Sequence, residues 1–323
     1  MRRRDPLYLT VSLDVEEEGL FGGRYARRSP SVTNTAHLFR LNPLLERGVR
    51  PTLFCAHSVL TDPASRAILA RLRDDAGAEI GAHLHHWSTP PLTDTSADGP
   101  PTRTDRLPRE LLRQRLRTLL DAGRDFQSAP LTSFRMGRWD LKDVVRPLLA
   151  EEGITLDSSV CPLRAFRGGP DHFLAPADPY WVEGVGRLLE APITQIPLWR
   201  PLARLWRGLT GGRPGPLDSF HFWGALSANP VWHSPRVMRL ASRLHAQRGG
   251  KVLSLFWHSS EMLPGASPNV PDQAAADALL QKIYDYLRWL RRNFNVRGIT
   301  AARLRAEAPD LDFPQRPAGR GDW

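Results

Sequence analysis

Several strand-like runs of the chain end in polar side chains that could hold a metal ion or move protons. Asp14 and Glu16 end the first run, and His83, His85 and His86 end a later one. Because side chains of a strand alternate between its two faces, Asp14 shares a face with Glu16, and His83 shares a face with His85. Carboxylates and imidazoles converging from different strands form a ligand set for a divalent cation, with coordination positions left open to water.

Three further polar residues follow later strand-like runs. Arg135 follows the fourth run, Asp157 the fifth, and His258 a strongly apolar run late in the chain. Each of them alone has a structural explanation. A strand-end acid often caps the next helix, and Asp157 could form an Asx turn before Ser158. Polar clusters at five successive strand ends are hard to obtain from caps alone, and they favour a functional site.

The elements that position these residues alternate along the chain. Strands are predicted at residues 7–13, 52–56, 79–85, 132–134, 154–156, 188–196 and 252–257, with a short closing strand at 299–300. Helices are predicted at residues 34–47, 64–75, 109–126, 141–151, 237–247 and 273–294. This alternation implies parallel strands joined by helical crossovers. After the first strand, where an open dinucleotide-binding sheet has a run of glycines, this chain has carboxylates, and their presence favours a barrel. In such a barrel the active site lies at the carboxyl ends of the strands.

Length and charge narrow the class of protein. The chain has 323 residues, 41% of them hydrophobic, which is enough to bury a large core and excludes disorder. Its formal net charge of +10 comes almost entirely from arginine, since lysine occurs only at Lys142, Lys251 and Lys282. The arginines are dispersed along the sequence rather than gathered in one block. We therefore expect no nucleic-acid partner.

Composition also bears on location and domain organisation. We expect no integral membrane segment, and the N-terminal run lacks the uninterrupted apolar core of a cleavable signal. Two cysteines form no disulfide framework, and this favours a reducing, cytoplasmic location.

Residues 1–310 are predicted to form one domain, followed by a tail at 311–323. A stretch rich in Trp, Arg and Pro at about 198–235 is predicted to be an insertion.

The chain contains, in this order, the segments LDVEEE, EIGAHLHHW, SFRMGRWDL, LDSSV and LSLFWHSSE. Their order and intervals resemble the five motifs of the polysaccharide deacetylases, the NodB-like carbohydrate esterases, over about residues 7–305. The resemblance implies an α/β fold, a distorted TIM-like (β/α) barrel of parallel strands. It also implies a divalent metal, usually zinc, and hydrolysis of an N- or O-acetyl group on an amino sugar or polysaccharide.

The resemblance assigns a role to each matching residue. Asp14 matches the catalytic base, and Glu16 matches the acidic metal ligand, although this chain has Asp-Val-Glu where many members have Asp-Asp. Arg135 matches the arginine that orients the base, without the prolines usual just after it. His258 matches the general acid, and Asp157 matches the acid that sets the tautomer and pKa of that histidine.

The histidine motif departs from the common pattern. His83 matches the first metal-binding histidine, but the usual second histidine four residues later is replaced by Trp87. The second ligand is then His85 or His86. Strand parity favours His85, whereas a helical turn starting at His83 would favour His86.

These roles predict a metal-dependent N-deacetylase that acts on an amino-sugar glycan or its precursor. Asp14 would take a proton from water, and His258 would protonate the leaving nitrogen. Glu17 and Glu18 have no part in this scheme and are expected to be solvated. Two alternatives remain open. One is a hydrolase of the same fold that cleaves another non-peptide C–N bond, as in a cyclic ureide, and the other is a metal-free barrel that binds a polyanion.

The tryptophans of the inserted stretch allow three interpretations. They could pack the insertion onto the barrel, which is the simplest expectation, or form a lid that stacks on sugar rings. A peripheral membrane contact through LWRPLARLWRGL is less favoured, because the segment is short and interrupted by Pro201.

Overall fold

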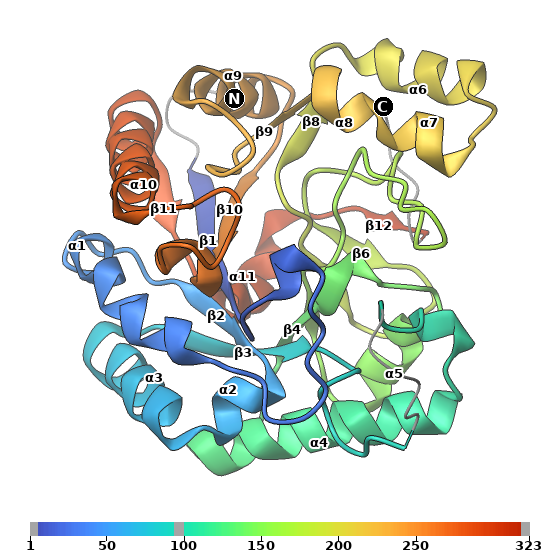
Figure 1. Ribbon diagram of the computed structural model, residues 1–323. Coiled ribbons are helices and arrows are strands. Elements are labelled where there is room, and N and C mark those ends of the chain that lie inside the picture. The colour runs from blue at the N-terminus through green and yellow to red at the C-terminus, as the bar shows by residue number, and fades with distance from the viewer. Residues whose placement is uncertain (1–5, 94–99, 318–323) are drawn as a thin grey trace.

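The computed structural model describes residues 6–93 and 100–317, and its centre is a curved sheet surrounded by helices (Figure 1). The strand order is β10 (Val252–His258), β1 (Leu7–Val15), β2 (Thr52–Cys55), β3 (Glu79–Leu84), β4 (Ser133–Met136), β5 (Leu156–Asp157), β7 (Leu189–Glu190), β6 (Tyr180–Val182) and β12 (Gln315–Arg316). Strand β11 (Val296–Gly298) pairs with β1 outside this order. Neighbours in this sheet are parallel except β6 and β7. The predicted distorted barrel of parallel strands is confirmed.

Strand β1 is buried along its whole length between β10 and β2. Its odd-numbered residues, such as Leu9 and Leu13, join the main hydrophobic core. Tyr8 belongs to a second apolar cluster with Phe54 of β2. The side chains of a strand alternate, so the face of β1 that carries Tyr8 also carries Asp14 at the carboxyl end of the strand.

Helices α3 (Pro63–Ala76), α4 (Arg109–Gln127), α5 (Val145–Glu151), α9 (Pro235–Gln247) and α10 (Gln273–Asn293) lie close to their predicted positions. Hydrogen bonds from N-cap side chains explain where two of these helices begin. The side chain of Asp62 accepts a hydrogen bond from the backbone of α3, and Asp272 does the same for α10. The short helices α2 (His57–Thr61) and α11 (Ala301–Glu307) were not predicted.

The helix predicted at residues 34–47 is wrong in type. The chain forms a 3-10 helix, η2 (Thr33–Leu41), followed by a single turn, α1 (Asn42–Leu45). Pro43 has no backbone N–H to donate to Phe39, so an α-helical ladder cannot run through this point. The backbone N–H of Asn42 bonds to the carbonyl oxygen of Phe39 instead.

Three other predictions are corrected. The strand predicted at residues 188–196 divides into β7 and β8 (Gln195–Pro197), with Pro192 between them. The closing strand lies at β11 rather than at residues 299–300, because Thr300 caps α11. The tail predicted at residues 311–323 contributes β12 to the sheet, where this strand pairs with β6. Residues 318–323 lie outside the described part.

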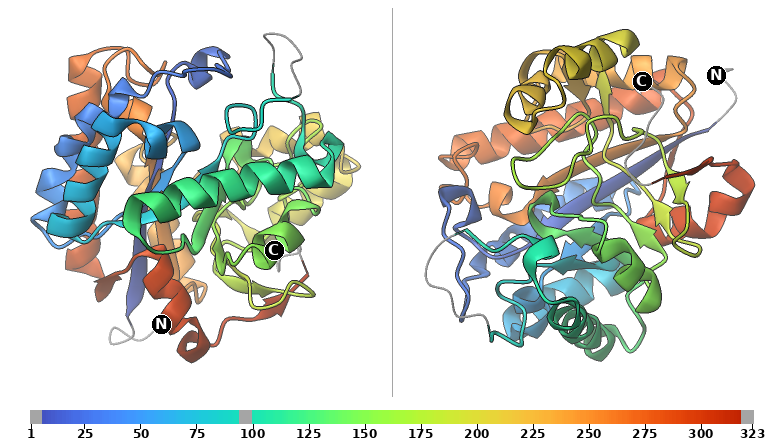
Figure 2. Two further views of the ribbon diagram at one scale, coloured as in Figure 1. Left: turned by 90° about the horizontal axis from the view of Figure 1, so that it is seen from below. Right: turned by 90° about the vertical axis from the view of Figure 1, so that its right-hand side faces the viewer.

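The stretch predicted to be an insertion forms, together with β8, a small unit of its own (Figure 2). Strands β8 and β9 (Ala225–Ser227) pair antiparallel, and between them lie α6 (Arg200–Leu209), α7 (Pro214–Asp218) and α8 (Phe220–Trp223). Phe220 packs against Phe173 in a local core. The backbone N–H of Ser254 in β10 donates to Oγ1 of Thr194 over 2.8 Å, which ties this unit to the barrel.

None of the helices within residues 6–93 and 100–317 combines the length and the hydropathy that crossing a bilayer would need.

Candidate metal centre

Glu16, His83 and His85 converge at the carboxyl end of β1 and β3, and all three are buried. Oε2 of Glu16 lies 3.2 Å from Nε2 of His83 and 3.2 Å from Nε2 of His85. In a tetrahedral zinc site with bonds of about 2.0 Å, neighbouring ligand atoms lie about 3.3 Å apart. One carboxylate and two imidazoles at this spacing therefore fit a divalent metal with an open position.

The structure places His85, not His86, in this cluster, in agreement with strand parity. The ring of His86 packs edge-on against Trp87, with ring centroids 5.3 Å apart. Trp87 also stacks on His85 at 4.3 Å and so holds that imidazole in place.

Both ligand histidines are oriented through their other ring nitrogen. Nδ1 of His83 lies 2.9 Å from the backbone oxygen of Arg135 and donates to it. Nδ1 of His85 lies 2.5 Å from Oε2 of Glu17. The hydroxyl of Ser88 donates to the other oxygen of Glu17. Such partners hold the imidazole that binds a metal with its Nε2 lone pair directed at the ion.

The expectation that Glu17 is solvated is wrong, because its side chain is buried against His85. The sequence did not reveal this contact, since Glu17 follows the end of β1 and strand alternation no longer fixes its direction. Glu18 is also engaged. It accepts hydrogen bonds from Oγ1 of Thr33 and the backbone N–H of Asn34, at the start of η2.

The electrostatics of the cluster favour a positive charge. Burial alone would raise the pKa of Glu16, but the charge of His258 and hydrogen bonds from His83 and His85 lower it below its ordinary value. Burial would lower the pKa of His85, but Glu17 and Glu16 raise it to about 10. Two buried carboxylates thus stabilise a cation here, and a bound metal would take the place of that proton.

Asp14 and Arg135 form a buried ion pair beside this cluster. Nη1 of Arg135 donates to Oδ1 of Asp14 over 2.6 Å. The guanidinium is fixed further, because Nε donates to the backbone oxygen of Ser158 and Nη2 donates to the Ser158 hydroxyl, each over 3.0 Å. With Oδ1 occupied, the second oxygen of Asp14 is directed toward Nε2 of His258, 3.8 Å away.

His258 ends β10 directly opposite Asp14 in the register of the sheet. Its Nδ1 lies 3.1 Å from Oε2 of Glu261, which belongs to the 3-10 helix η5 (Ser259–Met262). Burial would lower the pKa of His258, but the carboxylates of Glu261, Glu16 and Asp14 raise it to about 9. The imidazole is therefore protonated at neutral pH, as a general acid must be.

The prediction that Asp157 holds His258 is wrong, since Glu261 occupies that position. Four strands separate β5, which carries Asp157, from β10 in the order of the sheet, whereas Glu261 is three residues beyond His258. The His-x-x-Glu spacing was the available signal, because it matches a capping box.

Asp157 instead shares a buried position with Glu190 of β7, its partner in the sheet register. Burial raises the pKa of both carboxyls, and the repulsion between them adds to the rise for Glu190. The hydroxyl of Ser159 donates to Asp157 and accepts the backbone N–H of Met136 over 2.8 Å. Asp157 therefore supports the end of β4, next to Arg135.

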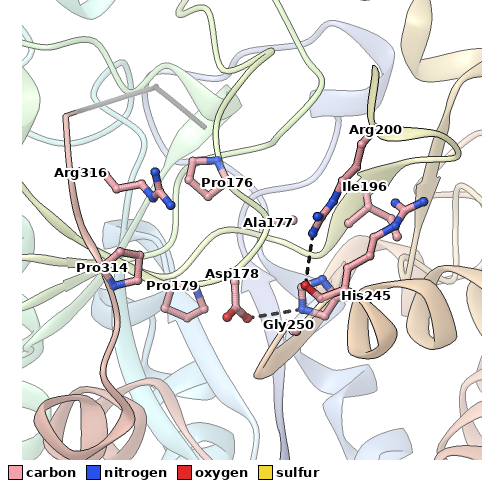
Figure 3. A pocket seen from close by; sticks show the side chains of 12 residues that line it. Pro176, Ala177, Asp178, Pro179, Ile196, Arg200, His245, Gly250, Pro314 and Arg316 are labelled. Carbon is pink, nitrogen blue, oxygen red and sulfur yellow. Dashed lines mark hydrogen bonds and ion pairs between the residues drawn. The ribbon is translucent and has the colours of Figure 1, made fainter. Parts of the chain in front are cut away.

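A pocket of about 200 Å³ lies at the opposite, amino-terminal edge of the sheet (Figure 3). Asp178 in its wall accepts hydrogen bonds from the backbone N–H groups of Lys251 and Val252, where β10 begins. Arg200 and His245 also line it. None of the candidate metal ligands or of the predicted catalytic residues lines this pocket.

Neither a family model nor a curated relative matches the chain, but solved structures do. A protein from Mycobacterium smegmatis designated a polysaccharide deacetylase is similar with a TM-score of 0.59 and 15% identity, over 100% of this chain and 98% of that one. The chain has the polysaccharide deacetylase fold. The fold predicted from the five motifs is thereby confirmed.

Other structures share the deacetylase fold with this chain. A protein from Parabacteroides distasonis designated a glycoside hydrolase/deacetylase has a TM-score of 0.60 and 11% identity, over 95% of this chain and 72% of that one. The Puue allantoinase has a TM-score of 0.58 and 14% identity, over 94% of this chain and 91% of that one. Because this fold carries more than one reaction, the function must be argued from the site.

Proposed function

We propose that this chain is a metal-dependent hydrolase that removes the acetyl group from the nitrogen of an amino-sugar glycan or glycan precursor. The observation that carries the proposal is the convergence of Glu16, His83 and His85 beside Asp14 and His258. The similarity to the Mycobacterium smegmatis protein supports a carbohydrate substrate. The cytoplasmic location expected from the sequence remains a prediction, and it favours a precursor.

An acetamide resists hydrolysis, because its carbonyl carbon is a poor electrophile and its amine is a poor leaving group. A divalent metal held by Glu16, His83 and His85 would polarise the carbonyl and acidify water. Zinc is the expected ion, because it prefers four-coordinate sites built from nitrogen and oxygen donors.

The protein's own side chains supply the proton transfers. Asp14 takes a proton from the attacking water on the oxygen that Arg135 leaves accessible. His258 donates its Nε2 proton to the nitrogen as the C–N bond breaks and the electron pair passes to nitrogen. The water oxygen stays on the acetyl carbon, and the products are acetate and an amine. Glu261 keeps His258 protonated for this step.

A second candidate is a hydrolase that opens a C–N bond in a cyclic ureide, and the similarity to the Puue allantoinase supports it. This reaction needs the same ligands and base but releases no acetate. A metal-free barrel that binds a polyanion is less consistent with the site, because two acidic side chains, Glu16 and Glu17, would remain buried beside His85 without a ligand.

The test is to load the purified chain with zinc and offer it N-acetylglucosamine oligomers and, separately, allantoin. We expect acetate and a free amine from the oligomers and no change in allantoin. Asp14→Ala should remove acetate release while circular dichroism shows the fold intact. Opening of allantoin without acetate release would establish the second candidate instead.

A further inference from the structure

The positive charge of this chain is concentrated in the segment that includes the insertion and α9. Residues 198–250 contain eight arginines and a single acid, Asp218, so they carry +7 of the formal net charge of +10. The acid is already engaged, because Nε of Arg164 donates to it over 2.7 Å. The arginines are dispersed through this segment as they are through the rest of the chain, and it is the scarcity of acids that leaves their charge unbalanced.

The same segment exposes large apolar side chains. Phe222 is 83% exposed, Leu209 68% and Trp199 60%. Six of the exposed apolar residues of this segment form what we call the α6/α8 patch: Leu198, Trp199, Leu205, Leu209, Phe222 and Trp223. Exposed aromatic and aliphatic side chains gathered in one place mark an interaction surface.

Contacts between the elements make the α6/α8 patch continuous. Along α6, Leu202, Leu205, Trp206 and Leu209 recur at helical spacing and form one stripe. The ring of Trp206 packs edge-on against Trp223 of α8, with centroids 4.9 Å apart. The helices lie together as one group in Figure 1.

Pro201 does not interrupt this helix. It stands in the first turn of α6, where its missing N–H has no intrahelical partner to lose. The interruption expected at Pro201 is therefore absent, and residues 200–209 form one continuous helix. A helix with leucine and tryptophan on one side and arginine on the other is typical of elements that lie in a bilayer interface.

Several arginines of the segment keep their charge uncompensated. Nη2 of Arg200 donates to the backbone oxygen of Arg248, and Arg248 donates to the backbone oxygens of Pro197 and Leu198. A carbonyl satisfies a donor without cancelling its charge. The guanidinium of Arg204 is exposed on the outer side of α6.

We propose that the α6/α8 patch docks the protein on an anionic lipid surface. The leucines and aromatic rings would enter the interface between headgroups and acyl chains, and the arginines would bind lipid phosphates. A nucleic acid would match the arginines but not the exposed leucines. A second copy of the chain would bring two strongly positive surfaces together, which costs free energy.

Ring contacts connect this patch to the candidate active site. Phe222 packs against His221, with centroids 5.4 Å apart, and His221 packs against Trp232 at 4.9 Å. Trp232 then contacts Phe256 at 5.4 Å, and Phe256 contacts His258 at 5.8 Å. If the proposed deacetylase function holds, docking brings the site close to a substrate carried on a membrane lipid. The docking itself does not depend on that function.

The experiment is co-sedimentation of the full chain with vesicles of phosphatidylglycerol mixed with phosphatidylcholine, and with vesicles of phosphatidylcholine alone. We expect binding to the anionic vesicles that salt weakens. The double variant Leu209→Ser with Phe222→Ser should bind about tenfold more weakly. Arg204→Glu should weaken binding by about fivefold or more. Phe39→Ser and Arg288→Glu are matched controls on other exposed surfaces and should bind normally.

Equal binding of the patch variants and the wild-type chain would overturn the proposal, and so would a loss in the controls. Binding of RNA that needs Arg204 but not Phe222, without vesicle binding, would make the patch a nucleic-acid surface. A dimer that dissociates in the patch variants would make it a self-association surface. Acetate release from a soluble oligomer should be unchanged in every patch variant, so a failure of docking is distinguishable from a failure of the proposed function.

Discussion

At the scale of single residues, two acids outside the predicted set complete the site. Glu17 holds His85, and Glu261 holds His258, each through Nδ1 of the ring. Strand alternation could place Glu16 and His85 in advance, because both were predicted from the parity of neighbouring positions. Glu16 and His85 each lie only one residue beyond a strand end, where alternation still holds. Glu17 and Glu261 lie two and three residues beyond theirs, where the turn of the chain decides the direction of the side chain.

Glu17→Gln tests the role of the first acid. The substitution removes the charge that faces His85 while keeping a side chain of the same shape. We expect zinc affinity, measured by competition with a chromogenic chelator, to fall by about 10- to 100-fold. Glu18→Gln is the matched control and should leave zinc affinity unchanged, because Glu18 binds the start of η2 instead. Wild-type affinity in Glu17→Gln would show that this acid does not support the ligand.

Glu261→Gln tests the second acid through the pH dependence of acetate release. The reaction needs protonated His258, so activity is present below its pKa of about 9 and is lost as the pH rises through that value. Removing the charge of Glu261 lowers this pKa, so acetate release should be lost at a lower pH than in the wild-type chain. Asp157→Asn, at the partner predicted from the sequence, should leave that pH unchanged. A shift in Asp157→Asn without one in Glu261→Gln would show that Glu261 does not set the pKa of His258.

At the scale of elements, the ends of β3 and β4 must approach closely to build the site. Gly137 follows β4, and a Cβ atom on it would lie 2.3 Å from Cδ2 of His85 and 2.8 Å from the backbone oxygen of Leu84. Glycine is therefore required here by packing against a metal ligand. The sequence showed Gly137 within the third motif but could not show which side chain it faces.

Gly137→Ala should displace the ring of His85. We expect a loss of stability of about 1–3 kcal/mol in urea unfolding and a larger loss of zinc binding. Gly298→Ala in β11 is the control, because a Cβ atom there would meet nothing within 4 Å. Full zinc affinity in Gly137→Ala would mean that His85 can bind the metal from another position.

At the scale of the whole molecule, the barrel was predictable because its signal is repeated. Strands β1 to β4 and β10 are each followed by helical segments, and polar residues recur at strand ends. An error at one element, such as the 3-10 helix η2, therefore does not change the fold. The inserted unit was not predictable. Its helices are short and pack on residues far away in the sequence, as Phe220 does on Phe173.

Metal binding should stabilise the whole fold, because Glu16 and the two histidines come from distant parts of the chain and meet only when it is folded. At a free zinc concentration about 100-fold above the dissociation constant, the gain is about 2.7 kcal/mol. We therefore expect a chelator to lower the Tm in differential scanning calorimetry. The variant His83→Ala should show no such difference between the zinc-loaded and chelated states. If the Tm of the wild-type chain were the same with zinc bound and after chelation, metal binding would not stabilise the fold as proposed.

The most direct test of the central claim is anomalous X-ray scattering at the zinc edge from a crystal of the zinc-loaded chain. The account predicts one strong peak bonded to Oε2 of Glu16 and Nε2 of His83 and His85, at about 2.0–2.1 Å from each. No peak at this position, or a peak ligated by His86 in place of His85, would contradict it.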